Sequence, residues 1–239
     1  SPRFALIYEP LPAHFIRLSH SRAHRTPTAF EKFYTDGAAI QPNPYLNIEH
    51  VNASELVLER RWSNQSRLLT TVYHQSTSDF IKSISYDPGF IQYINSRGGD
   101  ATGIEIEAEH HWQSNMRVRA SYAYQDSRNS KGHWSINSPH HLGKVNLTAP
   151  LFTDKLFGGV EVQIVSNRKT NNKDIANGYA ITNVTLSTNR LLRNLDVAFT
   201  VRNLFDTHYV HIAPDYNLPL YVIAQDERNF WLQLTYDFK

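Results

Sequence analysis

The sequence predicts an all-β protein whose strands form a transmembrane antiparallel β-barrel. Three observations carry this prediction. Polar and apolar residues alternate along most of the strands, short and long connections alternate between them, and no unbroken apolar stretch is long enough for a helical span. A helical span needs about 20 apolar residues, whereas outer-membrane barrels have short turns at one end and longer loops at the other. The chain is therefore expected to cross a membrane with strands.

Eleven strands are predicted, each bounded by residues that favour turns. Most are close to the roughly 9 to 11 residues that a tilted membrane strand requires. In chain order they span residues 3–9, 14–23, 52–62, 66–75, 101–112, 116–126, 140–149, 155–166, 178–189, 194–204 and 228–239.

The connections between these strands fall into two classes. Tight turns are predicted at 11–13, 63–65, 113–115, 152–154 and 190–193. Long loops rich in Asn, Asp, Ser, Gly and Pro are predicted at 24–50, 75–100, 126–139, 167–177 and 205–227. A soluble β-sandwich gives no reason for this segregation by length, so the pattern favours the membrane barrel.

The last strand shows the alternation most clearly. Because successive side chains of a strand point to opposite faces, one face carries an apolar row and the other is mostly polar. The apolar row is Phe230, Leu232, Leu234, Tyr236 and Phe238. We expect this row to face lipid.

Two neighbouring strands predict an ion pair on the lumenal face. Glutamates alternate with apolar residues from 104 to 109, and arginines alternate with apolar residues from 116 to 124. Antiparallel register through the short turn at 113–115 sets Glu109 opposite Arg119, which predicts a lumenal ion pair. The first four strands alternate less cleanly and receive no predicted facing.

The predicted number of strands is odd. An antiparallel barrel cannot close with an odd number, because its first and last strands would run in the same direction and leave unpaired edges. Either the count is wrong by one, or the chain is the C-terminal part of a larger barrel. In the second case the last strand closes the barrel against a strand that this chain does not contain.

Composition excludes several classes of protein. The 239 residues include 24 basic and 22 acidic residues, a net charge of +2 that offers no footprint for nucleic acid. The absence of cysteine excludes a disulfide scaffold and thiol chemistry. The chain does not open with the basic and apolar regions of a secretory signal, so any targeting segment is expected upstream of Ser1. No nucleophile elbow, H-E-x-x-H motif or phosphate-binding glycine loop is present, so an enzyme is not expected, although Ser–His lipase chemistry on a barrel wall stays open.

Four stretches of the chain, together with the last strand, resemble motifs of TonB-dependent outer-membrane receptors. They are Ser21-Arg-Ala-His-Arg-Thr-Pro-Thr-Ala-Phe-Glu31, Asn43-Pro-Tyr-Leu-Asn-Ile-Glu49, Gly103-Ile-Glu-Ile-Glu107 and Val201-Arg-Asn-Leu-Phe-Asp-Thr-His-Tyr209. Each motif is weak alone, but their order and spacing are specific. The resemblance implies that residues 1–239 form one domain, about the last eleven strands of a roughly 22-stranded barrel, without the family's plug.

The resemblance also implies a function. Such receptors take up scarce nutrients across the outer membrane of Gram-negative bacteria, here most consistently a ferric siderophore as transported ligand, with no resident cofactor or metal. The implied partners are outer-membrane lipid, the TonB energising complex acting through the missing N-terminal plug, and the barrel assembly machinery, which reads the apolar row of the last strand. A passive porin-like channel, a haem or cobalamin receptor and a truncated, non-functional barrel fragment stay open as alternatives. Haem is weakened because residues 28–42 contain no histidine.

Substrate-binding residues are expected in the long loops, where recognition residues concentrate. Aromatics with arginines suit an anionic, catecholate-like ferric complex, although aromatics also form the interfacial girdles of such barrels. The predicted binding residues are Arg22, Arg25, Phe30, Phe33, Tyr34, Tyr45, Tyr209, Tyr216, Tyr221 and Arg228. The pairs His110-His111 and His140-His141 are not predicted to bind metal, because adjacent strand residues point to opposite faces.

Overall fold

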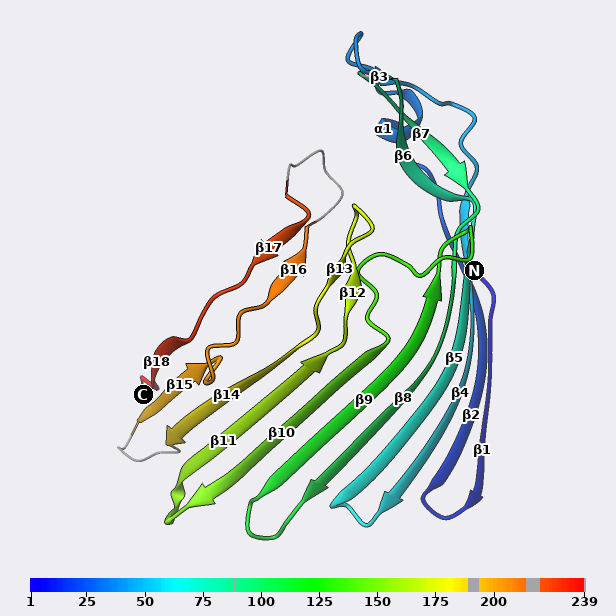
Figure 1. Cartoon of the computed structure of the whole chain (residues 1–239). Coiled ribbons are helices and arrows are strands. Elements are labelled where there is room, and N and C mark those ends of the chain that lie inside the picture. Colours follow the sequence, from blue (N-terminus) through cyan, green and yellow to red (C-terminus); the bar gives the residue numbers. More distant parts are fainter. Residues whose placement is uncertain (88, 189–193, 214–219, 239) are drawn as a thin grey trace.

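The computed structural model describes residues 1–87, 89–188, 194–213 and 220–238. Within them, the largest element is one antiparallel sheet of eleven strands that forms a curved wall (Figure 1). Its strands, in order across the sheet, are β1 (Arg3–Leu11), β2 (His14–Arg25), β4 (Glu49–Trp62), β5 (Ser66–Ser78), β8 (Asp100–His111), β9 (Arg117–Arg128), β10 (His141–Leu151), β11 (Thr153–Val165), β14 (Tyr179–Thr188), β15 (Leu195–Arg202) and β18 (Asn229–Tyr236). All eleven predicted strands are confirmed, and the observed bounds differ from the predicted ones by at most three residues.

The two edge strands, β1 and β18, each pair with one neighbour in this sheet. Every neighbouring pair in the sheet is antiparallel, so β1 and β18 run in the same direction. The predicted odd count and its geometric consequence are therefore both present among the described strands.

Strand register assigns one polar face to the sheet. Glu109 of β8 lies opposite Arg119 of β9, and Arg119 lies opposite Asn146 of β10. Asn146 in turn lies opposite Glu161 of β11, which lies opposite Asn183 of β14. Because residues directly opposite each other share a face, this row places charged and amide side chains on one side of the wall.

The register also assigns faces to the first four strands, which the sequence left open. Glu59 of β4 lies opposite Leu69 of β5, and Leu69 lies opposite Glu107, so Glu59 is on the polar face. Leu58, one residue earlier, lies opposite Thr70, which lies opposite Ile106. The apolar face therefore continues onto these strands.

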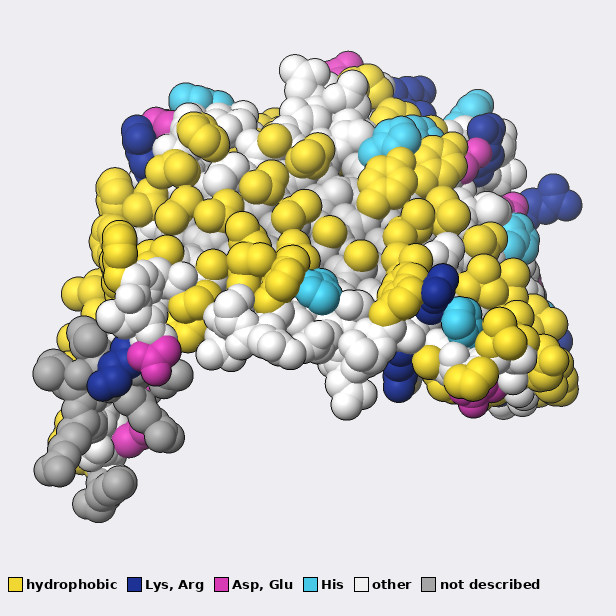
Figure 2. All heavy atoms as spheres, turned by 90° about the horizontal axis from the view of Figure 1, so that it is seen from below, with side chains coloured by type: hydrophobic (Ala, Val, Ile, Leu, Met, Phe, Trp, Pro, Cys, Tyr) yellow, Lys and Arg dark blue, Asp and Glu magenta, His cyan; other side chains and the backbone are white. Residues whose placement is uncertain are grey.

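The apolar face is not covered by any other layer of the described structure. Leu58 on β4 and Val145 on β10 are both 44% exposed, although both lie on interior strands. Hydrophobic side chains spread over the face seen in Figure 2, and most charged side chains lie toward its margins. Among the described residues no side chain is fully buried, and the buried apolar residues are few. An apolar face of this extent requires lipid or another apolar surface.

The predicted ion pair between Glu109 and Arg119 is corrected by the structure. The two residues are opposite each other, but Glu109 pairs with Arg117 at 2.5 Å and Arg119 pairs with Glu107 at 2.9 Å. Long arginine side chains lean along the strand and reach a diagonal neighbour, which simple opposition does not predict. All four side chains lie on the polar face.

Four of the predicted short turns lie at one end of the wall (Figure 1). Ala13, Ser63, Asn115 and Phe152 each adopt a positive φ there, of 64°, 59°, 62° and 25°. Left-handed residues of this kind reverse the chain within a few positions. The fifth predicted turn, 190–193, lies outside the described residues.

The long connections contain small elements that the sequence analysis treated as loops. They are α1 (Ala29–Phe33), β3 (Ile40–Gln41), β6 (Phe80–Asp87), β7 (Phe90–Ser96), β12 (Arg168–Lys169), β13 (Ile175–Ala176), β16 (Val210–Ile212) and β17 (Val222–Ala224). The largest is the β6–β7 hairpin, which pairs with β3 and stands above the wall next to α1 (Figure 1). Among the described residues, α1 is too short to cross a membrane, and no other helix that could do so is present.

Candidate functional site: the polar wall and the loop end

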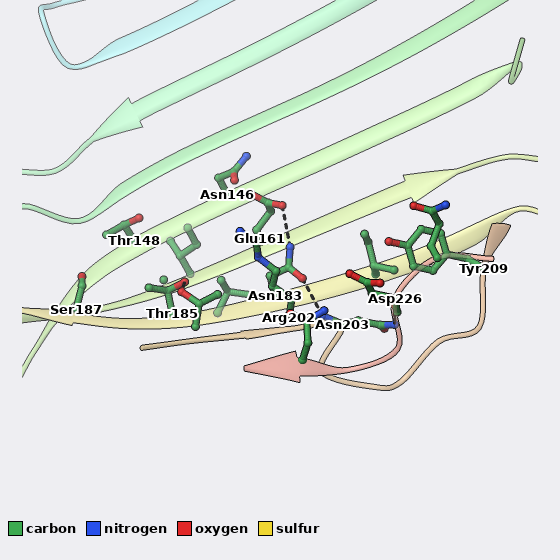
Figure 3. A pocket seen from close by; sticks show the side chains of 17 residues that line it. Asn146, Thr148, Glu161, Asn183, Thr185, Ser187, Arg202, Asn203, Tyr209 and Asp226 are labelled. Carbon is green, nitrogen blue, oxygen red and sulfur yellow. Dashed lines mark hydrogen bonds between the residues drawn. The ribbon is translucent and has the colours of Figure 1, made fainter. Parts of the chain in front are cut away.

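The polar face of β10, β11, β14 and β15 forms a hollow of about 580 Å³ that the loop after β15 also borders. Its walls are built from amide, hydroxyl and charged side chains, which converge from several strands (Figure 3). The lining includes Asn146, Thr148, Glu161, Asn183, Thr185, Ser187, Arg202, Asn203, Tyr209 and Asp226. Such a surface suits hydrated or hydrogen-bonding ligands, because it offers many donors and acceptors and few apolar groups.

A chain of hydrogen bonds fixes one side of this hollow. The side-chain amide of Asn183 donates to Glu161 Oε1 at 3.0 Å, and its Oδ1 accepts from the backbone N–H of Asn203 at 2.9 Å (Figure 3). Asn203 is 4% exposed and has a φ of 51°. Its side chain donates to the Thr207 carbonyl and accepts from the Thr207 N–H, both at 2.9 Å. This asparagine therefore holds the turn after β15.

Arg228, a predicted binding residue, belongs to the same turn. Asp206 adopts a φ of 56° and accepts from the Arg228 backbone N–H at 2.7 Å, while the guanidinium of Arg228 lies 3.8 Å from its carboxylate. The Asn-Leu-Phe-Asp stretch at 203–206 thus works as a turn that positions β18. In this structure Arg228 stabilises that turn through its backbone N–H, and the Asp206 carboxylate partly neutralises its charge.

Arg25, another predicted binding residue, connects the barrel wall to the first long loop. Its guanidinium pairs with Glu49 of β4 at 2.8 Å and with Glu31 of α1 at 3.0 Å. Thr28 and Glu31 form a capping box, in which the Thr28 N–H donates to the Glu31 carboxylate at 2.7 Å and the Glu31 N–H donates to Thr28 Oγ1. Two carboxylates already satisfy Arg25.

Two acidic groups of this loop have lowered pKa values. Burial opposes ionisation of Glu31, but the Thr28 backbone N–H and the Arg25 guanidinium outweigh it and hold the pKa of its carboxyl below the ordinary value. The Ile40 and Ala38 backbone N–H groups lower the pKa of the Asp36 carboxyl by donating to it. Both carboxylates therefore order residues 28–41 when they are ionised.

Arg22 lies on the other side of the wall from Arg25. In the β2–β4 ladder Arg22 lies opposite Asn52, and Arg25 lies opposite Glu49. Successive strand residues point to opposite faces, so two residues three positions apart lie on different faces. The side chain of Arg22 is exposed. The structure thus separates two arginines that the sequence analysis grouped.

The predicted loop aromatics form two groups. In the first loop Phe30 stacks on Tyr34 with ring centroids 4.4 Å apart and meets the edge of Tyr93 at 6.1 Å, whereas Phe33 and Tyr45 are exposed. In the last loop Tyr209 packs on Tyr179 at 4.6 Å and borders the polar hollow, and Tyr221 precedes β17 with its side chain exposed. Tyr216 lies outside the described residues.

His110 and His111 point to opposite faces, as the alternation predicts, whereas the rings of His140 and His141 both lie near Tyr124, because His140 precedes β10. His110 contacts the Trp112 ring and shares a hydrogen bond with Ser66, whereas His111 pairs with Glu109 on the polar face. His141 shares a hydrogen bond with Tyr122, whereas His140 Nδ1 lies 2.8 Å from the Gln125 carbonyl oxygen. Among the described residues no group of three or more possible metal ligands is present.

Sequence analysis missed two basic residues of the β6–β7 hairpin and the segment after it, Lys82 and Arg97. Lys82 lies on β6, and Arg97 follows β7. Both were counted as part of a long loop. The Asp87-Pro-Gly89 stretch is a turn signal between two alternating runs, and it would have predicted the hairpin.

The fold described here matches a known family. The TonB dependent receptor-like β-barrel family matches residues 1–204. The chain belongs to this family. Its members are receptors and transporters rather than enzymes. No curated protein matches the chain.

Solved structures of receptors share the fold at low identity. The ferric enterobactin receptor PfeA of Pseudomonas aeruginosa has a TM-score of 0.81 and 17% identity over 99% of this chain and 40% of its own. The ferric-catecholate import receptor Fiu of Escherichia coli K12 has a TM-score of 0.77 and 18% identity over 99% of this chain and 34% of its own. The copper transporter OprC has a TM-score of 0.79 and 18% identity over 98% of this chain and 39% of its own. The chain thus spans about two fifths or less of these proteins, and the likeness shows the fold.

Proposed function

We propose that this chain forms the wall and ligand-binding loops of an outer-membrane receptor for energised uptake of a ferric siderophore in a Gram-negative bacterium. The observation that carries the proposal is the eleven-strand wall with an apolar outer face, a polar inner face and elaborated loops at one end, in a chain of the TonB-dependent receptor family. Two of the similar structures are named as receptors for ferric catecholate and ferric enterobactin, which supports an iron complex as cargo.

The proposed receptor needs partners beyond this wall. Energy would come from the TonB complex acting through a plug, which in this family is separate from the barrel. The apolar row of β18, from Phe230 to Phe238, is proposed as the signal for the barrel assembly machinery. Its side chains are strongly exposed, from 55% at Tyr236 to 91% at Phe238, so a partner can reach them.

Uptake of radioactive iron by the host bacterium tests this proposal. Deleting the gene for the protein should abolish uptake of one ferric siderophore under iron limitation, and restoring the gene should restore it. Removing TonB or dissipating the inner-membrane proton gradient should have the same effect as the deletion. Unchanged uptake after removal of TonB would favour a passive channel, and rescue of growth by haem or cobalamin alone would replace the siderophore as cargo.

A further inference from the structure

A second hollow lies at the loop end of the wall. It has a volume of about 460 Å³ and is bordered by the foot of the β6–β7 hairpin, the segment before β8 and the loop after β9. In Figure 1 these three segments lie together at the upper end of β5, β8 and β9. Its lining includes Lys82, Arg97, Ser127, Ser135 and Phe80.

The charge of this lining is positive. Lys82 and Arg97 have no ion pair or side-chain hydrogen bond within the described part of the chain. Arg128 also borders the hollow, but it is committed to Asp126 at 2.9 Å and to the Gly132 carbonyl at 3.2 Å. Asp100 is the one acidic residue among the lining residues, so two uncommitted cations face one carboxylate.

The backbone beside Arg97 is held in place by close packing. A Cβ added at Gly98 would lie 2.1 Å from the Thr77 carbonyl oxygen, and one added at Gly99 would lie 2.4 Å from the Arg128 carbonyl oxygen. The Thr77 N–H also donates to the Gly99 carbonyl at 2.9 Å. These contacts hold the segment between its neighbours, so little backbone ordering is needed beside Arg97 when a ligand binds.

Arg97 also borders a third hollow of about 550 Å³ on the same segment. The lining of the second hollow also contains hydroxyl groups and an aromatic ring. Ser127 donates to Ser135 at 3.0 Å, and Phe80 is 43% exposed. The combination of free cations, hydroxyls and a ring suits a large anion with aromatic parts.

The sequence analysis placed this role on three arginines. Arg25 and Arg228 are already paired with carboxylates, and Arg22 lies on the other side of the wall. We propose instead that Lys82 and Arg97 form the anion-binding subsite of the receptor, which recognises a cargo complex of multiple negative charge. This inference rests on the proposed uptake function. It names the cargo class as polyanionic and assigns the subsite to the β6–β7 hairpin and the segment that follows it.

Binding measurements on the purified full-length protein in detergent test the subsite. The probes are a ferric tris-catecholate, which is trianionic, and an uncharged ferric trihydroxamate. The double variant Lys82→Gln with Arg97→Gln should bind the tris-catecholate about tenfold more weakly at low salt, because it removes two exposed charges that attract the trianion. The difference should shrink in high salt. Lys131→Gln is the matched control, because Lys131 is exposed on the neighbouring loop and lines neither hollow.

An iron-free probe separates this inference from the uptake proposal. A trisulfonated pyrene dye carries similar charge and aromatic surface, and its anisotropy reports binding directly. If the wild type binds the dye and the double variant does not, the subsite stands even where no ferric complex is taken up. If the double variant binds both polyanions as tightly as the wild type and the Lys131→Gln control, the assignment is overturned.

Discussion

Replacing Asn203 by alanine should destabilise the barrel wall more than replacing it by glycine. Asn203 is 4% exposed, adopts a φ of 51° and makes two side-chain hydrogen bonds of 2.9 Å with Thr207. Both substitutions remove the side-chain bonds. Only alanine places a Cβ in a left-handed conformation.

The size of the effect follows from these contacts. Two good hydrogen bonds to a buried turn contribute about 1 kcal/mol each, so Asn203→Gly should cost about 2 kcal/mol. A non-glycine residue without a local side-chain bond pays about 1 kcal/mol more in the left-handed region, so Asn203→Ala should cost about 3 kcal/mol. The third contact, to the Asp226 carbonyl at 3.4 Å, is long and adds little.

Equilibrium unfolding in urea with lipid vesicles measures both values, with loss of heat-modifiable migration as the readout. Asn229→Ala is the control, because Asn229 borders the same hollow but its side chain makes only local hydrogen bonds, to the Glu227 carbonyl and from the Trp231 indole N–H. The reasoning fails if Asn203→Ala is within about 0.5 kcal/mol of the wild type, or if glycine is as damaging as alanine.

Four further predictions follow from other parts of the wall. Leu232→Arg on the apolar face of β18 should cost about 2 to 4 kcal/mol in lipid, whereas Gln233→Arg on the polar face should be nearly neutral, and equal costs would contradict the assigned faces. Double-mutant cycles should give a coupling of up to about 1 kcal/mol for Glu107 with Arg119 and a smaller one for Glu109 with Arg119, because only the first pair is in contact at 2.9 Å. Gly98→Ala should lower stability by more than about 1 kcal/mol, while Gly143→Ala, whose added Cβ would lie 3.8 Å from Ile164, should be tolerated in the same melting assay. The pKa values of the Glu31 and Asp36 carboxyls are lower in the folded protein than in the unfolded chain, so these groups stabilise the loop fully above the unfolded pKa values near 4 and lose that effect as pH falls through the folded pKa values. Protection of the Ala38 and Ile40 amides from hydrogen exchange should therefore decline only in acid. In Asp36→Asn this protection should not depend on acid.

The strands were predictable because period-two alternation and turn residues are local signals. The row from Phe230 to Phe238 and the tight turns at Ala13, Ser63 and Asn115 all carry such signals, and the structure has the strands where they indicate. Ion-pair partners were less predictable. Opposition of Glu109 and Arg119 follows from register, but the choice of a diagonal partner depends on how long side chains lean.

The loop site was the least predictable part, because a sequence does not show which charged side chains form ion pairs within the folded protein. Arg25 and Arg228 are prominent in loop motifs, yet each forms an ion pair with a carboxylate more than 20 residues away in the chain. Lys82 and Arg97 carry no motif. Their shared border on one hollow depends on the β6–β7 hairpin and on the close contacts at Gly98, which only three-dimensional packing defines.

The wall is a single sheet between two environments, and this thinness determines which changes in chain length the protein can accept. Along β15, Asp196, Thr200 and Arg202 face the polar side while Val197, Phe199 and Val201 face the other. One residue inserted near the start of this strand would exchange the two sets, placing a guanidinium in hydrocarbon and a phenyl ring in water as far as the next turn. Insertions and deletions should therefore accumulate in the long loops and be eliminated from the strands.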